Sequence, residues 1–357
     1  MKLLIAGFGS IGRRHFRNLL TLAERDILFY RTGHSTLADD ELAGHPIETD
    51  LRAALAHQPE AVIVANPTSL HLDVAIPAAE AGCHLLLEKP ISHSMDRVDD
   101  LIAAVQRGGG KVLVGFQFRF HPALQWIAEN QASLIGRPLS FRVHWGEYLP
   151  GWHPWEDYRL GFSARADLGG GVILTLCHPL DYLRWLFGEV AELWAFAGHS
   201  SDLDLQVEDT AEIGLRFQNG VLGSVHLDYN QRPPTHTLEI IGTEGTIRWD
   251  NADGAVRLFS ISSLKSPLSG RGAGGEGFLP SPLSGRGAGG EVEWLTYPPP
   301  PNFERNDLFL AEMRHFLAIA LGEAEPLCTL QDGIQALRLA LATHESARGG
   351  RLSRLNQ

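Results

Sequence analysis

Two short motifs contain the residue types that could carry out redox chemistry. The first is a glycine turn, Gly7-Phe8-Gly9-Ser10-Ile11-Gly12, between an apolar run at residues 3–6 and a helix-like run at residues 13–20. Its glycines allow a tight turn, and the N-terminus of the next helix offers free N–H groups to a pyrophosphate. The second, Glu88-Lys89-Pro90, follows an apolar run and places a cation beside an acid. We therefore predict an oxidoreductase with a dinucleotide site, the alternative being a glycine-rich turn in another kind of α/β protein.

The residues after the second apolar run indicate which dinucleotide is bound. An NAD site usually places an acid about 20 residues beyond the glycines, on the ribose 2′-hydroxyl. Here that place holds the run Arg31-Thr32-Gly33-His34-Ser35. Arg31 can bind a 2′-phosphate through two hydrogen bonds, and the hydroxyls of Thr32 and Ser35 could add donors. We predict NADP as the cofactor, with NAD as the alternative if Arg31 only stacks on the adenine.

The elements that must position these motifs alternate between strand and helix up to about residue 120. Repeated βα units favour a doubly wound parallel sheet, in which the carboxyl ends of the strands share one edge. The glycine turn, Asn66-Pro67-Thr68 and Glu88-Lys89-Pro90 all follow strands, so they should meet at that edge. The expected strands lie at residues 3–6, 27–30, 61–65, 84–87 and 112–116, and expected helices include residues 69–81 and 94–107.

Beyond residue 121 the pattern changes to strands joined by short turns, which suggests a mainly antiparallel sheet; Gln218-Asn219-Gly220 is a hairpin signal. We predict two domains: residues 1–120, a Rossmann domain, and residues 121–357, an open-sheet α+β domain for substrate binding and oligomerisation. The expected helices lie at residues 122–129, 171–187, 309–321 and 330–348, and the expected strands at residues 139–145, 190–197, 210–217, 220–227, 236–241 and 245–249.

One segment fits neither domain. Residues 266–276 recur identically as residues 281–291, with a composition of Gly, Ser, Pro and Arg that has little to bury. Two copies are too few and too polar for a solenoid. We interpret residues 262–290 as a flexible insertion between strands, the alternative being an anion-binding arm built on Arg271 and Arg286.

Composition excludes several classes of function. A formal charge of −12 and a pI of about 5.7 argue against a nucleic-acid partner. No apolar run approaches the roughly 20 residues that span a bilayer, and the N-terminus lacks a signal peptide. Cys83, Cys177 and Cys328 are scattered without metal-type spacing. We expect a cytoplasmic protein with reduced cysteines and with no bound metal and no membrane partner.

Together these motifs resemble the Gfo/Idh/MocA family, named for glucose–fructose oxidoreductase, inositol dehydrogenase and a rhizopine-catabolism enzyme. The resemblance covers nearly the whole chain outside the repeat. It is specific for the family and not for a substrate. It rests on Gly7–Gly12, Asn66-Pro67-Thr68 with His71, Glu88-Lys89-Pro90, Val114-Gly115-Phe116 leading to Arg119-Phe120-His121-Pro122, and Gly169-Gly170-Gly171 followed by His178 and Asp181.

The resemblance implies that Lys89 lies by the nicotinamide, where its charge would stabilise a developing alkoxide. Glu88 would orient Lys89 or contact the nicotinamide ribose, and Asn66, Pro67 and His71 would line the nicotinamide side of the site. The resemblance also implies a homodimer or homotetramer, paired through the open face of the second sheet.

His178 is the candidate for proton transfer, because a neutral imidazole can accept a hydroxyl proton near working pH. Asp181, three residues later, could orient it or balance its charge. The alternatives are a core histidine and an ordinary helix acid. Active family members commonly carry an Asp one turn before this His, where this chain has Leu174 and Thr175.

That departure leaves three options. Lys89 and His178 are sufficient by themselves; another acid, namely Asp181, Glu156 or Asp157, substitutes; or hydride chemistry is impaired. The last option would make the chain a catalytically weak NAD(P)-binding sensor.

An aromatic loop at residues 152–159 lies where the substrate loop of the family falls. Its rings can stack on a sugar, and nearby polar side chains can bind hydroxyls, carboxylate or phosphate. As a set they favour a carbohydrate-like substrate, which can be a sugar, a nucleotide-sugar or a polyol. The candidates are Arg119, His153, Tyr158, Arg159 and Arg165.

Overall fold

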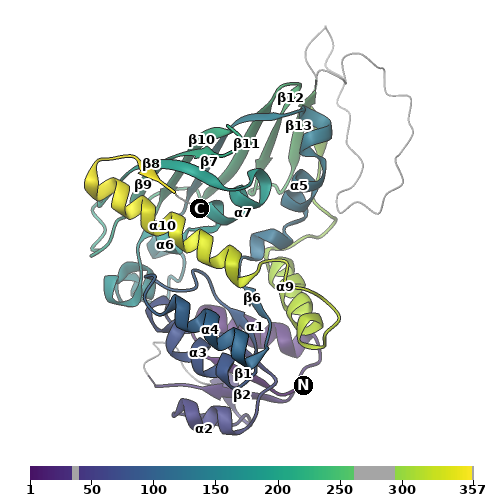
Figure 1. Cartoon of the computed structure of the whole chain (residues 1–357), viewed down its shortest axis with the longest axis vertical. Coiled ribbons are helices and arrows are strands. Elements are labelled where there is room, and N and C mark those ends of the chain that lie inside the picture. Colours follow the sequence, from purple (N-terminus) through teal and green to yellow (C-terminus); the bar gives the residue numbers. More distant parts are fainter. Residues whose placement is uncertain (34–39, 261–293, 356–357) are drawn as a thin grey trace. The chain divides into compact units, whose positions relative to one another are not determined.

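The computed structural model describes residues 1–33, 40–260 and 294–355 (Figure 1). The chain forms two compact units that interleave along the sequence. The first comprises Met1–Gln117, Trp155–Cys177 and Arg305–Leu341, and the second comprises Phe118–Pro154, His178–Glu304 and Ala342–Gln357. Ser35 and the repeat insertion lie outside the described residues. A division into folding domains at residue 120 stays a prediction.

The first unit is built on a six-stranded parallel sheet with the order β3-β2-β1-β4-β5-β6. Every residue of β1 and β4 is buried, as expected for a parallel sheet covered on both faces. The predicted Rossmann fold is confirmed. The strands are β1 Leu3–Ala6, β2 Ile27–Tyr30, β3 Ile47–Glu48, β4 Ala61–Val64, β5 His84–Leu87 and β6 Val112–Val114.

In the first unit, helices α1 to α4 alternate with the strands of the sheet, and later segments of the chain add α6 and α9. In α1 the buried face includes Phe16 and Leu19, and Asp50 caps α2 by accepting a hydrogen bond from the Ala53 N–H at 2.9 Å. The helices are α1 Ser10–Thr21, α2 Leu51–Ala56, α3 His71–Glu80, α4 Val98–Gly108, α6 Val172–Thr175 and α9 Arg305–Ala320, and α10 Leu330–Gly349 runs through both units.

The expectation of one helix over residues 171–187 is wrong. Two helices, α6 and α7 (His178–Phe187), stand in its place. Pro179 explains the break, because it lacks the N–H that a continuous helix would direct to the carbonyl of Thr175. The carbonyl of Thr175 is therefore available to another donor.

The second unit contains a nine-stranded sheet with the order β14-β13-β12-β11-β7-β10-β9-β8-β15. β7 and β10 pair in parallel and the other neighbours pair in antiparallel fashion, so the predicted mainly antiparallel sheet is confirmed. The strands are β7 Pro138–Gly146, β8 Val190–Gly198, β9 Thr210–Phe217, β10 Leu222–Asp228, β11 Thr235–Gly242, β12 Gly245–Asp250, β13 Val256–Ser260, β14 Leu295–Tyr297 and β15 Ser353–Arg354.

The two faces of this sheet differ. Along β7, Phe141, Val143 and Trp145 are buried and alternate with side chains that stay partly exposed. α5 (Pro122–Ile135) and α7 lie on the buried face, where Phe187 stacks on Phe141 with ring centroids 5.5 Å apart (Figure 1). We call the other face the open face; its members include Arg142, His144, Glu212, Ser224, His226 and Thr237.

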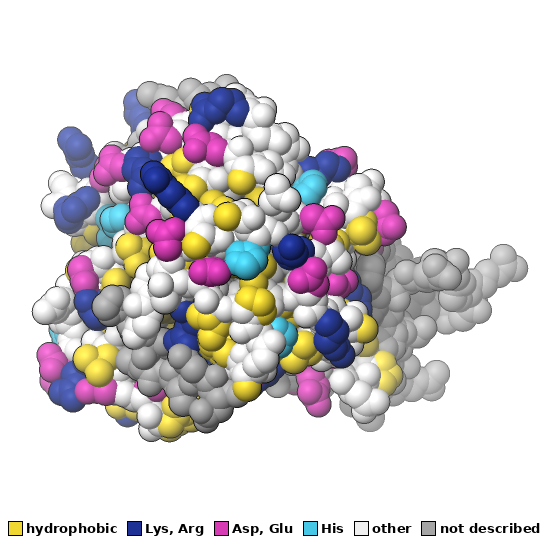
Figure 2. All heavy atoms as spheres, turned by 90° about the horizontal axis from the view of Figure 1, so that it is seen from below, with side chains coloured by type: hydrophobic (Ala, Val, Ile, Leu, Met, Phe, Trp, Pro, Cys, Tyr) yellow, Lys and Arg dark blue, Asp and Glu magenta, His cyan; other side chains and the backbone are white. Residues whose placement is uncertain are grey.

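The surface and the cysteines agree with an ordinary acidic globular protein. Figure 2 shows Lys and Arg side chains interspersed with Asp and Glu on the described part of the face that it draws. Within the described ranges, every helix is too short or too polar to cross a bilayer. The three cysteines are buried, and burial raises the pKa of Cys83 to about 11.

Candidate active site

The glycine turn after β1 has the geometry that a dinucleotide requires. Gly7 has a φ of +94°, and a Cβ there would lie 2.6 Å from the backbone N of Asn66. A Cβ on Gly12 would lie 2.3 Å from the carbonyl oxygen of Gly7, so packing requires both glycines. A Cβ on Gly9 would meet no atom within 4 Å. Internal packing does not explain Gly9, whereas a pyrophosphate lying against the backbone does. The turn therefore fits an NAD(P) pyrophosphate.

Arg31 lies beside this turn, at the end of β2. Its N–H donates to the carbonyl of Glu48 at 2.9 Å, and its guanidinium lies 5.8 Å from the ring centroid of Phe8. Arg13 lies over the same ring at 4.5 Å and pairs with Glu41 at 3.0 Å. Two cationic groups thus contact a residue of the glycine turn, which fits the charge of a 2′-phosphate.

Lys89 is positioned by a backbone carbonyl. Its Nζ donates to the carbonyl oxygen of Thr175 at 2.8 Å, the same carbonyl that Pro179 leaves without a helical donor. Leu174 and Thr175 are both buried. A neutral carbonyl therefore orients the ammonium of Lys89.

Glu88 is a buried anion immediately before Lys89. Its Oε1 lies 2.7 Å from His15 Nε2, and its Oε2 accepts the backbone N–H of Lys89 at 3.3 Å. Burial by itself would raise the pKa of Glu88, but the hydrogen bond from His15 and the charge of Lys89 keep it below its ordinary value. A Cβ on Gly115 would lie 3.2 Å from the Glu88 carboxyl, so the glycine makes room for it.

Glu312 on α9 is a second carboxyl in this cluster, and sequence reasoning missed it together with His15. One ligand atom each of His15, Glu88 and Glu312 lie within 4.8 Å of one another. Within the described residues, both carboxyl oxygens of Glu312 are buried without a hydrogen-bond partner. Burial and the nearby charge of Glu88 raise the pKa of Glu312 well above its ordinary value. The two carboxyls thus differ in state, with Glu88 ionised and Glu312 protonated.

Glu312→Gln should remove a pH dependence of stability. Because the folded-state pKa of Glu312 is raised, its contribution is complete below its unfolded pKa and is lost as pH rises towards the folded pKa. We expect the melting temperature of the variant to gain on the wild type as the pH is raised from about 5 to about 8. Glu323→Gln, at an exposed position just after α9, is the control. Parallel curves for wild type and Glu312→Gln would show that Glu312 is not held protonated.

His71 joins two of the predicted loops. It is fully buried, with Nδ1 2.9 Å from the carbonyl oxygen of Pro90 and Nε2 3.0 Å from that of Asn66. Burial lowers its pKa, so the ring is neutral. The Asn66 amide donates to the carbonyl of Leu70 at 2.9 Å, while its Oδ1 is buried without a hydrogen-bond partner among the described residues. His71 therefore positions these loops, and contacts of Asn66, Pro67 and His71 with the cofactor stay predictions.

In the second unit, His178 lies at the start of α7 in an aromatic environment. Its ring centroid is 5.1 Å from that of Phe118 and 5.4 Å from that of Trp145. His236, which sequence reasoning missed, stacks on Trp145 at 4.3 Å, and its Nε2 lies 3.2 Å from the Tyr182 hydroxyl. The inward position of His236 on β11 is the signal that could have identified it. His178 is thus fixed by rigid neighbours.

Arg119 and Asp181 are joined to each other. Arg119 Nε donates to Asp181 Oδ2 at 2.9 Å and Arg119 Nη2 donates to Oδ1 at 2.7 Å, and both side chains are buried. This bidentate pair balances the charge of Asp181. Direct contacts of either residue with a substrate stay predictions.

The remaining candidates are divided between the two units. Tyr158 and Arg165 belong to the first unit with Lys89, whereas His153 belongs to the second unit with His178. Arg165 Nε donates to Asp167 Oδ1 at 3.0 Å. Asp157 accepts three hydrogen bonds from the side chain of Arg159, which lower its pKa. Asp157 is therefore an ionised partner of Arg159.

Comparison with known proteins finds two family models that match parts of the chain. Residues 1–116 match the model of the oxidoreductase family with an NAD-binding Rossmann fold, and residues 125–248 match the GFO/IDH/MocA C-terminal domain.

Individual relatives extend this result. The uncharacterized oxidoreductase YrbE of Bacillus subtilis (strain 168) is 30% identical over 267 residues, which is 70% of this chain and 73% of the relative. The 1,5-anhydro-D-fructose reductase of Ensifer adhaerens is 26% identical over 328 residues, covering 90% of this chain and 84% of the relative. Among solved structures, a levoglucosan dehydrogenase in complex with NADH is similar with a TM-score of 0.80 at 21% identity, covering 100% of this chain and 99% of that one.

Proposed function

Because the chain belongs to the Gfo/Idh/MocA family and is an NAD(P)-dependent oxidoreductase, we propose that it transfers a hydride between the nicotinamide of NADP and a carbinol or keto carbon. The proposed substrate is a sugar, a nucleotide-sugar or a polyol, in keeping with the names of the reductase and the dehydrogenase that it resembles. The observation that carries the proposal is Lys89, whose ammonium is oriented by the carbonyl of Thr175 beside an ionised Glu88. The proposed assembly is a homodimer or homotetramer paired through the open face.

The chemistry follows from the side chains. The nicotinamide, when bound, accepts or donates the hydride. The ammonium of Lys89 stabilises the negative charge that develops on the substrate oxygen. The imidazole of His178 accepts the hydroxyl proton during oxidation and returns it during reduction. Glu88 provides a negative charge next to Lys89 in the chain, and the contact between Glu88 Oε1 and His15 Nε2 holds the Glu88 carboxylate in position.

One observation favours a catalytically weak sensor as the second candidate. Among the described residues, Lys89 Nζ donates to the carbonyl of Thr175, which is not a base. The family resemblance implies an Asp one turn before His178 in active members, where this chain has Leu174 and Thr175. A chain that binds the cofactor tightly but lacks an efficient proton path would report on cofactor or sugar levels without turnover.

A panel of sugars, nucleotide-sugars and polyols, assayed with both oxidised cofactors, tests the proposal. We expect the absorbance of reduced nicotinamide to rise with at least one member of the panel. Tight cofactor binding without turnover across the panel, in both directions, would favour the sensor.

Arg31→Asp tests the cofactor preference. Replacing a charge-assisted phosphate contact by a repulsive carboxylate should weaken NADPH binding by about 10- to 100-fold and leave NADH binding equal or improved. Calorimetric titration with both cofactors measures the change. Arg25→Asp is the control, since Arg25 is exposed and donates to the carbonyl oxygens of Leu20 and Glu24. Equal losses for the two cofactors would contradict the assignment, and Arg31→Ser, which adds no charge, repeats the test.

A further inference from the structure

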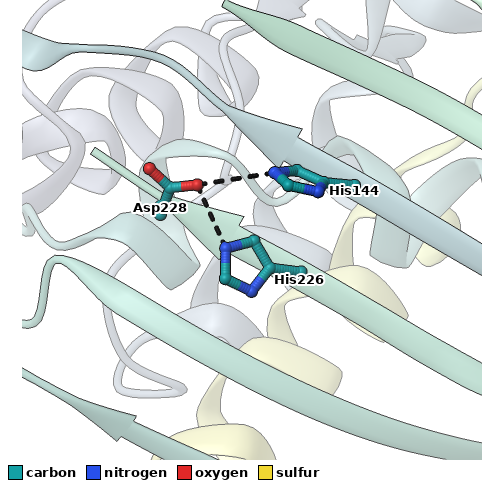
Figure 3. Close-up of side chains that lie close together, drawn as sticks. All are labelled: His144, His226 and Asp228. Carbon is teal, nitrogen blue, oxygen red and sulfur yellow. Dashed lines mark hydrogen bonds and ion pairs between the residues drawn. The ribbon is translucent and has the colours of Figure 1, made fainter. Parts of the chain in front are cut away.

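We propose that the open face of the nine-stranded sheet carries a site for a divalent transition metal, formed by His144, His226 and Asp228 (Figure 3). His144 on β7 and His226 on β10 are paired residues of the parallel ladder. Asp228 follows two residues after His226, so its side chain leaves β10 on the same face. The three side chains converge, as Figure 3 shows.

The distances suit a metal ion. His226 Nε2 lies 3.1 Å from Asp228 Oδ2, and His144 Nε2 lies 3.7 Å from the same oxygen. One ligand atom from each residue lies within 4.8 Å of the others. Metal bonds of about 2.0–2.2 Å in a tetrahedral site place ligand atoms roughly 3.3–3.6 Å apart. Small side-chain movements therefore bring all three onto one ion.

Neighbouring groups orient two of the three ligands. Asp228 Oδ1 accepts the backbone N–H groups of Asn230 and Gln231, each at 2.6 Å, so Oδ2 is the oxygen that faces the histidines. Glu212 Oε1 lies 2.5 Å from His226 Nδ1. A carboxylate on one ring nitrogen fixes the proton there and leaves the other nitrogen to bind a metal.

His144 supplies a further observation. Its Nε2 is buried and makes no hydrogen bond among the described residues, and it faces Asp228 Oδ2 at the longer distance of 3.7 Å. A bound cation would satisfy this nitrogen and also balance the charges of Asp228 and Glu212.

The donor set selects the class of metal. Two imidazole nitrogens and one carboxylate oxygen suit Zn²⁺ and its first-row neighbours, whereas Mg²⁺ and Ca²⁺ prefer oxygen ligands. The expectation of no metal came from cysteine spacing, and only the pairing of β7 with β10 brings these ligands together.

Zinc titration of the tag-free, EDTA-treated full chain tests the site. By calorimetry, we expect one Zn²⁺ per chain and a higher melting temperature with Zn²⁺. Glu212→Gln removes the carboxylate that orients His226 and should weaken zinc binding by about 10- to 100-fold. His144→Gln removes a ligand and should weaken zinc binding at least as much. His57→Gln is the matched control, because His57 Nε2 pairs with Glu48 Oε1 at 2.8 Å in the first unit.

Two results would overturn the proposal. The first is that the wild-type chain does not bind about one equivalent of Zn²⁺. The second is that the wild type, His144→Gln and Glu212→Gln bind Zn²⁺ with equal affinity. The second result would mean adventitious binding. Glu212→Gln retains all three ligands, so it keeps the test valid if His144→Gln folds poorly. The site uses neither Lys89 nor His178, so the result is independent of the proposed oxidoreductase reaction.

Discussion

Lys89→Ala should lower kcat by about 10²- to 10³-fold, the usual loss when one donor to a developing oxyanion is removed. The Kd for NADPH should stay nearly unchanged, because the glycine turn and Arg31 are the groups proposed to bind the pyrophosphate and the 2′-phosphate. Stopped-flow assays give kcat, and calorimetry gives the Kd.

Lys111→Ala provides the matched control for this experiment. Lys111 is a partly exposed lysine of the same unit, and its Nζ lies 2.8 Å from Glu325 Oε1. It should leave kcat unchanged. A Lys89→Ala enzyme that loses NADPH affinity in proportion to kcat would show that Lys89 binds the cofactor and does not act on the substrate oxygen.

His178→Gln should lower kcat by about 10²- to 10⁴-fold, the range for loss of a general acid–base group. Glutamine preserves much of the volume against Phe118 and Trp145 but cannot accept a proton. The pH profile of kcat should also lose the limb that reports the proton acceptor. Both readouts are measured with the substrate that the sugar panel identifies.

His199→Gln is the control for this variant, since His199 is exposed and its Nε2 lies 2.9 Å from the carbonyl oxygen of Ser201. A wild-type pH profile in His178→Gln would assign proton transfer to another group. In that case the acids named from the sequence would need individual tests.

The sequence pattern was sufficient to predict the parallel sheet of the nucleotide-binding unit and the position of the motifs on it. The three motifs follow apolar runs that form β1, β4 and β5. His71 contacts the carbonyl groups of both Asn66 and Pro90, in agreement with the prediction that the loops after these strands meet at one edge of the sheet. The prediction of one helix over residues 171–187 was wrong, although Pro179 is a sequence signal for the break between α6 and α7.

Other features could not be read from the sequence, because they depend on elements far apart in the chain. Glu312 has the spacing of an ordinary helix acid, and only the packing of α9 makes it a buried neighbour of Glu88 and His15. The sequence presented Arg119 and Asp181 as separate candidates for ligand binding, whereas in the fold they form a buried ion pair with each other. His144 and His226 align only because β10 pairs with β7 after β8 and β9 have intervened.

Transfer of deuterium from NADPH labelled at the nicotinamide C4 tests the central claim most directly. The wild-type chain is mixed in a single turnover with the keto form of the sugar that the panel identifies, and the product is examined by mass spectrometry. The account predicts that the label moves to the carbinol carbon of the product in the wild type, about 10²- to 10³-fold more slowly in Lys89→Ala. Tight binding of the labelled cofactor with no label in any sugar of the panel would contradict it.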